Sequence, residues 1–269
     1  MLDLTPEMKI LLTQVDMLRK EYAELFEQRN FMLKYEETTL TSLYLSLIGK
    51  HQFRLFCLQG EQAKLMQRIK LAQAYFNRNE VPDWHKIDKE VQAAFKEYQQ
   101  KIEDEAARLA AANEFFKSGF LKEEDAMQLK SVYKLLVKKL HPDLHPNQSA
   151  KEYEMFLNVQ AAYDLSDLKA MNEILLYITG MKEEVKSVVI PDLKTTVARL
   201  MEMNDVLKDK IDQLQKAFPF CFREKLKDDK WIESENNKLS FQIENTEKEI
   251  KEKTEYLLLL KSWKPELLH

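Results

Sequence analysis

The sequence predicts an all-α protein made largely of long, coiled-coil helices. Only 4 of the 269 residues are glycine, which leaves little material for tight hairpin turns and β-bulges. Charged residues make up 32% of the chain and hydrophobic residues 45%, a balance typical of amphipathic helices and too apolar for general disorder. Over much of the chain, apolar residues also recur at the alternating spacing that is typical of coiled coils.

Residues 1–114 are assigned to an N-terminal region of long helices. The pattern blurs at "YEETTLTS", where threonine and serine favour a turn or a cap, so a second helix is expected from about residue 40 to 76. Asn79 and Pro82 should end it, and a third helical run is expected from about 83 to 116. The seam of the first helix consists of Met8, Leu11, Val15, Leu18, Tyr22, Leu25, Arg29 and Met32.

Residues 188–269 are predicted to form an antiparallel coiled-coil hairpin. If the chain folds back near "FPFCF", Asn204 of the first helix should face Asn236 of the second. A polar pair within a seam fixes register, but each asparagine can equally lie at the rim in contact with water. A strict seam can also be completed by a second copy of the chain, so a homo-oligomer remains open. The two seams are Leu193, Val197, Leu200, Asn204, Leu207, Ile211, Leu214 and Phe218, and then Ile232, Asn236, Leu239, Ile243, Thr246, Ile250, Lys253, Leu257 and Leu260.

A pair of shorter helices is predicted between these regions. The first has an apolar face with Leu129, Val132, Leu136 and Leu140, and its opposite face is basic. Pro142 should stop this helix and hold a rigid, exposed turn with Asp143, after which a new helix begins near residue 149. The basic face consists of Lys130, Lys134 and Lys138, with Lys139 alongside.

The segment "VYKLLVKKLHPDLHPN", followed by "MFLNVQAAYD", resembles the J-domain of DnaJ-type co-chaperones. In that family a tyrosine and a leucine on a basic helix precede a His-Pro-Asp turn, and a phenylalanine and an alanine-tyrosine pair follow on the returning helix. The resemblance covers about residues 115 to 180. Nothing in the sequence resembles the glycine-rich linker, the zinc-binding module or the client-binding β-domains of full DnaJ proteins. The whole chain looks like a group of bacterial proteins that carry "LHPDL" within long coiled coils.

The resemblance implies a binding module that docks on a DnaK-type ATP-dependent chaperone and stimulates its ATP hydrolysis, while the coiled coils bind a client or scaffold protein. It assigns chaperone binding to His141, Pro142, Asp143, Lys134, Lys138 and Lys139. It assigns the packing between the two helices to Tyr133, Leu136, Leu140, Phe156, Ala162 and Tyr163. The sequence-based expectation is that the His-Pro-Asp turn is exposed.

The main alternative is a coiled-coil scaffold that keeps the His-Pro-Asp turn only as a helical hairpin. We expect no enzyme and no cofactor, because the sequence shows no phosphate-binding glycine loop, nucleophile elbow or paired catalytic carboxylates. His141 and His145 have a ligand-like spacing, but two prolines interrupt any helix there and no metal site is predicted.

The composition gives no general reason to expect nucleic acid as a partner, since the formal net charge is −4. The apolar runs are too short for a transmembrane segment, and the start of the sequence lacks a signal-peptide pattern. We therefore expect a cytoplasmic protein. Cys57 and Cys221 lie far apart and suggest neither a disulfide nor a thiolate metal site.

Overall fold

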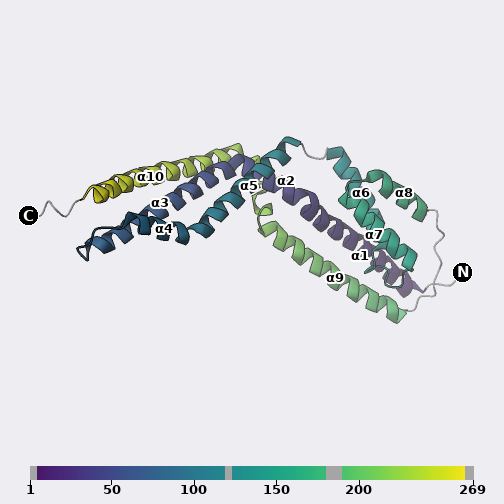
Figure 1. Cartoon of the computed structure of the whole chain (residues 1–269). Coiled ribbons are helices and arrows are strands. Elements are labelled where there is room, and N and C mark those ends of the chain that lie inside the picture. The colour runs from purple at the N-terminus through teal and green to yellow at the C-terminus, as the bar shows by residue number, and fades with distance from the viewer. Residues whose placement is uncertain (1–4, 119–122, 180–189, 264–269) are drawn as a thin grey trace, which may run out of the picture. The chain divides into compact units, whose positions relative to one another are not determined.

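The computed structural model describes residues 5–118, 123–179 and 190–263. Within these ranges the chain is helical and contains no strand, which confirms the all-α prediction (Figure 1). The chain divides into two compact units, each made from two separate stretches of sequence. Unit 1 comprises Met1–Leu40 and Phe120–Cys221, and unit 2 comprises Thr41–Gly119 and Phe222–His269. The boundaries of these units differ from those of the predicted regions 1–114, 115–180 and 188–269.

Unit 1 is built around α1, which lies between α9 and α6 (Figure 1). Helix α8 packs against both α6 and α7. The core includes Val15 and Tyr22 of α1, Val137 of α6, Met171 of α8 and Leu200 of α9, all of them buried. The elements are α1 (Pro6–Phe31), a π-helical turn η1 (Met32–Glu36), α6 (Glu123–Leu140), α7 (Ala150–Asp164), α8 (Leu168–Thr179) and α9 (Ile190–Lys216).

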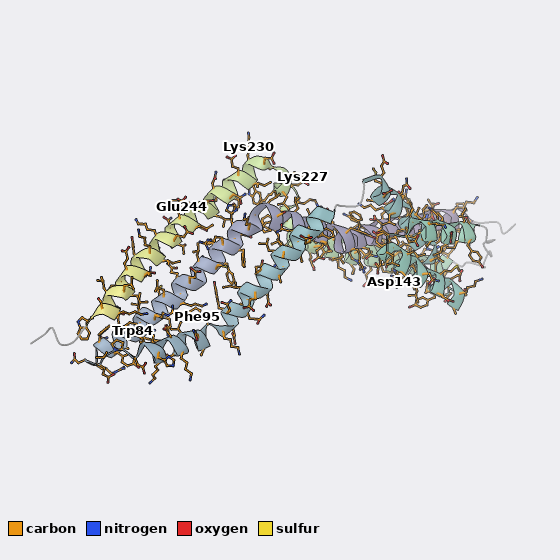
Figure 2. All side chains as sticks on the ribbon, turned by 45° about the horizontal axis from the view of Figure 1, so that its top comes forward. Trp84, Phe95, Asp143, Lys227, Lys230 and Glu244 are labelled. Atoms are coloured by element: carbon orange, nitrogen blue, oxygen red, sulfur yellow. The ribbon has the colours of Figure 1, made fainter. Side chains whose placement is uncertain are left out.

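Unit 2 is built around α3, with α10 along one side and α4 and α5 along the other (Figures 1 and 2). Its smaller cluster of Ala72, Ile87 and Val91 joins α3 to α4. The elements are a π-helical turn η2 (Leu45–Gly49), α3 (Lys50–Phe76), α4 (Trp84–Ala94), α5 (Lys96–Ser118), the 3-10 turn η4 (Lys225–Lys227) and α10 (Asp229–Ser262). Helix α2 (Glu37–Tyr44) and the 3-10 turn η3 (Phe220–Phe222) each contain one boundary between the units.

The two C-terminal seams exist, but their partners differ from the predicted hairpin. Helix α9 packs along α1 in unit 1, and α10 packs along α3 in unit 2. Both pairs are parallel. Lys194 and Lys208 of α9 form ion pairs with Glu7 and Glu21 of α1 in the same order. Likewise, Glu247 and Tyr256 of α10 contact Arg54 and Gln73 of α3 in the same order. A periodic seam specifies an apolar face but not which helix covers it. The two covering helices, α1 and α3, have similar lengths of 26 and 27 residues.

The predicted contact between Asn204 and Asn236 is therefore replaced by two separate contacts. Asn204 is 1% exposed and its Nδ2 donates to the backbone oxygen of Leu18 at 3.1 Å and to Glu21 Oε2 at 3.0 Å. Asn236 Nδ2 donates to the backbone oxygen of Leu47, in the π-helical turn η2, at 3.1 Å. Each amide thus binds a helix from the N-terminal half, where its directional bonds favour one register of the pair.

Two helix boundaries also differ from expectation. The segment "YEETTLTS" is helical and contains part of η1 and part of α2. Thr39 is accommodated because its Oγ1 donates to the backbone oxygen of Tyr35 at 2.8 Å. The third helical run is divided at Phe95, labelled in Figure 2, whose φ of −103° and ψ of 10° leave the helical region. Neither proline nor glycine marks this break in the sequence.

In the part of the chain that the structure describes, no helix combines the length and the apolar character needed to cross a bilayer.

Gly60 of α3 permits a close approach of α5, and its replacement by alanine should destabilise unit 2. A Cβ atom at this position would lie 2.1 Å from Cε1 of Tyr98. The ring must then move, although its hydroxyl donates to the backbone oxygen of Phe56 at 2.7 Å. Overpacking of this kind costs about 1–3 kcal/mol, of which the better helix propensity of alanine returns at most about 1 kcal/mol. Urea denaturation followed by tryptophan fluorescence measures the effect.

The matched control places the same change in a Tyr98→Leu background, where the clashing ring is absent. There Gly60→Ala should be neutral or stabilising, by up to about 1 kcal/mol. Equal destabilisation in both backgrounds would contradict the steric explanation.

Candidate functional site

The candidate site is the turn between α6 and α7 together with the face of α6 that leads to it. The packing residues beneath it are buried, and the ring centroids of Tyr133 and Tyr163 stack at 3.9 Å. Ser149 caps α7: its Oγ accepts from the backbone N–H of Glu152, whose carboxylate accepts in return from the Ser149 backbone N–H at 2.6 Å. The buried residues are Tyr133, Leu136, Leu140, Phe156, Ala162 and Tyr163.

His141 forms the base of the turn and is buried, whereas the sequence predicted it to be exposed. Its ring lies among three aromatic rings, with centroid distances of 4.4 Å to Phe26, 4.9 Å to Phe156 and 5.1 Å to Tyr22. The helix α1 supplies two of these rings, and the predicted hairpin considered alone contains neither. The buried His141 therefore packs against the core of unit 1, to which these three rings belong.

The imidazole of His141 also holds the turn in shape. Its Nδ1 accepts a hydrogen bond from the backbone N–H of Asp143 at 3.1 Å, which assigns the ring proton to Nε2. Burial lowers the pKa of His141 to about 4, and the neighbouring Asp143 carboxylate opposes this shift. The ring is neutral at pH 7, and it acts as a fixed acceptor and not as a titrating base.

His145 lies on the other side of the turn and binds the backbone. Its Nε2 lies 2.8 Å from the carbonyl oxygen of Lys138. This contact closes the turn over the C-terminal end of α6. Within the described ranges, no group of three or more histidine, cysteine or acidic side chains is arranged to hold a metal.

Asp143 is the exposed member of the turn, and Figure 2 labels its position. Its side chain is 59% exposed, while Pro142 before it is half-buried. Oδ2 of Asp143 accepts a hydrogen bond from the hydroxyl of Tyr22 at 2.9 Å. Burial raises the pKa of Tyr22, and the hydrogen bond to Asp143 raises it further, so the tyrosine donates throughout the physiological range.

The predicted lysines lie along α6 in different degrees of contact with α1. Lys138 Nζ lies 2.9 Å from Asp16 Oδ1, and Lys134 Nζ lies 3.7 Å from Glu24 Oε1. Lys139 is exposed. Two of the three lysines therefore already face carboxylates of α1, and the third extends into solvent.

The contribution of α1 is what the sequence interpretation missed. We assigned α1 one seam, yet beside the seam residue Tyr22 it also buries Ala23 and Phe26, which lie outside that seam, where α1 packs against α6. Arg19 adds a hydrogen bond from its guanidinium to the backbone oxygen of Leu144 at 3.2 Å. A signal was present, because Ala23, Phe26 and Asn30 repeat at helical spacing beside the seam.

Glu27 is a buried acid in this same interface. It is 9% exposed, and among the described residues its Oε1 has no hydrogen-bond partner. Burial raises the pKa of Glu27 to about 7, and Lys130 and Lys134 act in the opposite direction. The carboxyl is therefore close to half-protonated at neutral pH.

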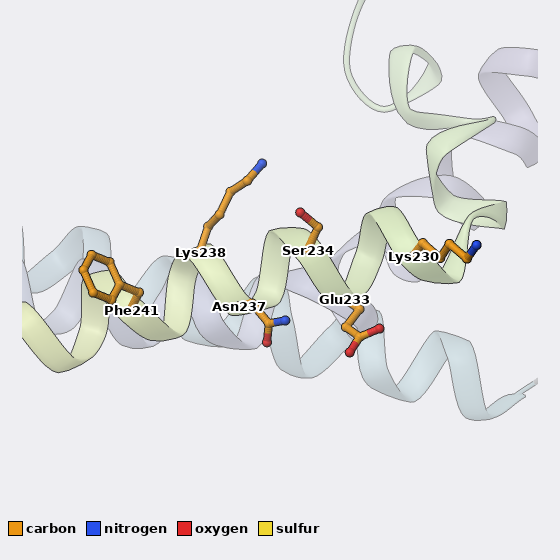
Figure 3. A pocket seen from close by; sticks show the side chains of 6 residues that line it. All are labelled: Lys230, Glu233, Ser234, Asn237, Lys238 and Phe241. Atoms are coloured by element: carbon orange, nitrogen blue, oxygen red, sulfur yellow. The ribbon is translucent and has the colours of Figure 1, made fainter.

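A surface depression of about 550 Å³ lies on α10 and does not resemble an active site. Figure 3 shows that one helix supplies all of its lining side chains, and Phe241 among them is 65% exposed. An active site needs groups that converge from several directions on one reacting atom. The lining residues are Lys230, Glu233, Ser234, Asn237, Lys238 and Phe241.

Taken together, the site offers a fixed turn with one exposed carboxylate and a row of ammonium groups. This arrangement can bind a partner through hydrogen bonds and charge, and it contains no activated nucleophile. Comparisons with protein-family models, curated proteins and solved structures found no match.

Proposed function

We propose that this protein is a non-enzymatic, J-domain-like adaptor that docks on a DnaK-type chaperone and stimulates its ATP hydrolysis. The observation that carries the proposal is the presentation of Asp143. Its side chain is 59% exposed just beyond the end of α6, and that helix carries Lys134, Lys138 and Lys139. The turn beneath it is fixed by the buried ring of His141, whose Nδ1 accepts from the Asp143 backbone at 3.1 Å.

Physical arguments support docking at this surface. A turn that is already fixed loses little conformational entropy when a partner binds. Lysines on a rigid helix steer an acidic partner surface and suppress wrong orientations. Lys139 is exposed, and the side chains of Lys134 and Lys138 keep 40% and 31% of their area in solvent. The long helices of the two units would provide the surface for a client or a scaffold protein.

The second candidate function is a scaffold in which the His-Pro-Asp turn is only a structural joint. The burial of His141 against Phe26 of α1 favours it, because the turn then serves to attach the α6–α7 hairpin to α1. In that case the exposure of Asp143 would have no role in binding a chaperone.

Steady-state ATP hydrolysis by a DnaK-type chaperone, with and without the full chain, tests the proposal. The wild-type protein should stimulate hydrolysis, and Asp143→Asn should weaken the apparent affinity by about 10- to 100-fold, as expected for loss of a charge-assisted hydrogen bond. Asp125→Asn is the matched control, since Asp125 is an exposed acid near the start of α6. Equal stimulation by wild type and Asp143→Asn would contradict docking through the turn. A folded protein that neither binds nor stimulates would favour the scaffold.

A further inference from the structure

Helix α1 presents to α6 the kind of polar groups that an acidic partner would present. Asp16 lies against Lys138 at 2.9 Å, and Glu24 lies against Lys134 at 3.7 Å. Between them along the helix, the hydroxyl of Tyr22 donates to Asp143 at 2.9 Å. These side chains extend over about 12 Å of α1 at 1.5 Å per residue, so one short stretch of helix reaches both the lysines and the turn.

The match to the docking residues is specific. The resemblance assigns six residues to chaperone binding, and α1 contacts three of them, Lys134, Lys138 and Asp143, through side chains of the complementary kind. Carboxylates face the two ammonium groups, and a hydroxyl donor faces the carboxylate. A docked chaperone would need the same hydrogen-bonding directions and the same charges.

From this overlap we infer that α1 is autoinhibitory, because its side chains compete with the chaperone for the docking residues of unit 1. The inference rests on the proposed function. Chaperone docking and the α1 contacts at Lys134, Lys138 and Asp143 exclude each other. The wild-type protein is a partly masked adaptor whose apparent affinity includes the cost of displacing these side chains.

Release requires only that exposed side chains rotate, not that α1 leaves unit 1. Tyr22 is 4% exposed and stays packed, and Asp143, whose side chain is 59% exposed, turns away from its hydroxyl. The four side chains of the two ion pairs are 31–69% exposed, and exposed ion pairs of this kind contribute little net stability. Beneath them, Phe26 remains packed on His141 with a centroid distance of 4.4 Å. The competition is therefore graded, and relief of it should change apparent affinity by a few-fold up to about tenfold.

The test compares variants that remove the competing groups and keep the packing. Tyr22→Phe removes the hydroxyl bound to Asp143 without changing any charge, and the double variant Asp16→Asn/Glu24→Gln neutralises the two carboxylates. Glu7→Gln is the control, because Glu7 pairs with Lys194 of α9 at 2.7 Å, away from α6. The measured quantity is the concentration of full-length protein that gives half-maximal stimulation of chaperone ATP hydrolysis.

We expect that concentration to fall about three- to tenfold for Tyr22→Phe and for the double variant, and to stay constant for Glu7→Gln. Adding Asp143→Asn to either gain-of-function variant should abolish the gain. If wild type and all variants stimulate equally, the inference is overturned and the proposed function stands. A gain for the double variant but none for Tyr22→Phe would assign the effect to net charge and would also overturn it. If no variant stimulates or binds although circular dichroism shows native helix content, the proposed function itself fails.

Discussion

Replacing Tyr133 with alanine should lower the free energy of unfolding of unit 1 by about 3–5 kcal/mol, the usual cost of truncating a fully buried aromatic residue. Tyr133 is 1% exposed, and its ring stacks on Tyr163 at 3.9 Å. Its hydroxyl also accepts a hydrogen bond from Asn30 of α1 at 2.9 Å, so one side chain joins α6 to both α7 and α1. A cavity there would loosen the base of the docking surface.

Urea denaturation followed by far-ultraviolet circular dichroism measures this loss. Tryptophan fluorescence provides an internal reference, because all three tryptophans, Trp84, Trp231 and Trp263, belong to unit 2. The control is Tyr133→Phe, which keeps the stacked ring, loses only the hydrogen bond to Asn30 and should cost about 1 kcal/mol. Equal losses for alanine and phenylalanine would contradict the assignment of the stability to ring packing.

Replacing Glu27 with glutamine should stabilise unit 1 by an amount that depends on pH. The ordinary pKa of a glutamate is 4.5, and burial raises the pKa of Glu27 to about 7. Below pH 4.5 the carboxyl is protonated in both the folded and the unfolded chain, so it has no effect on stability there. Between pH 4.5 and 7 the unfolded chain releases the proton first, and the folded state becomes progressively less stable. Above pH 7 the penalty is constant, at about 3 kcal/mol, since each unit of pKa difference is worth about 1.4 kcal/mol.

The measurement is the difference in unfolding free energy between Glu27→Gln and wild type at several pH values. That difference should be small near pH 4, rise through pH 5 and 6, and level off above pH 7. His141 titrates with the opposite sign, because burial lowers its pKa to about 4 and costs stability as the pH falls below its ordinary value of 6.5. Both proteins keep His141, so its effect cancels in the difference. A difference that does not change with pH would show that Glu27 is solvated in the folded protein.

The sequence predicted helix faces well and helix partners poorly. The buried or half-buried face of α9 includes Leu193, Leu200, Asn204 and Leu207, all members of the predicted seam. Periodicity identifies such a face because apolar residues that recur every three or four positions fall on the same side of a helix. It carries no information about the covering helix, and here the partners are α1 and α3, far away in sequence. Distinguishing parallel from antiparallel pairing needs the tertiary contacts themselves.

At the candidate site, too, the sequence predicted local structure but not the contacts with a distant helix. Local chemistry predicted the end of α6 before Pro142 and the new helix after Ser149, because proline and a capping serine act within a few residues. The burial of His141 was not predictable from the hairpin, since Tyr22 and Phe26 lie more than a hundred positions earlier. The contacts of Asp16 and Glu24 were missed for the same reason: acids on a helix are usually solvated, and only the fold places them beside lysines of α6.

The most direct test of the account asks whether a chaperone covers the turn and the lysines of α6. Lysine acetylation of the full chain, with and without an ATP-bound DnaK-type chaperone, can be read out by mass spectrometry. Exposed Lys139 should be protected by the chaperone, and Lys134 and Lys138 should be protected with it, while exposed Lys230 on α10 should react unchanged. Protection at Lys139 that disappears in Asp143→Asn is the result the account predicts. Unchanged reactivity along α6 under conditions in which the chaperone binds would contradict it.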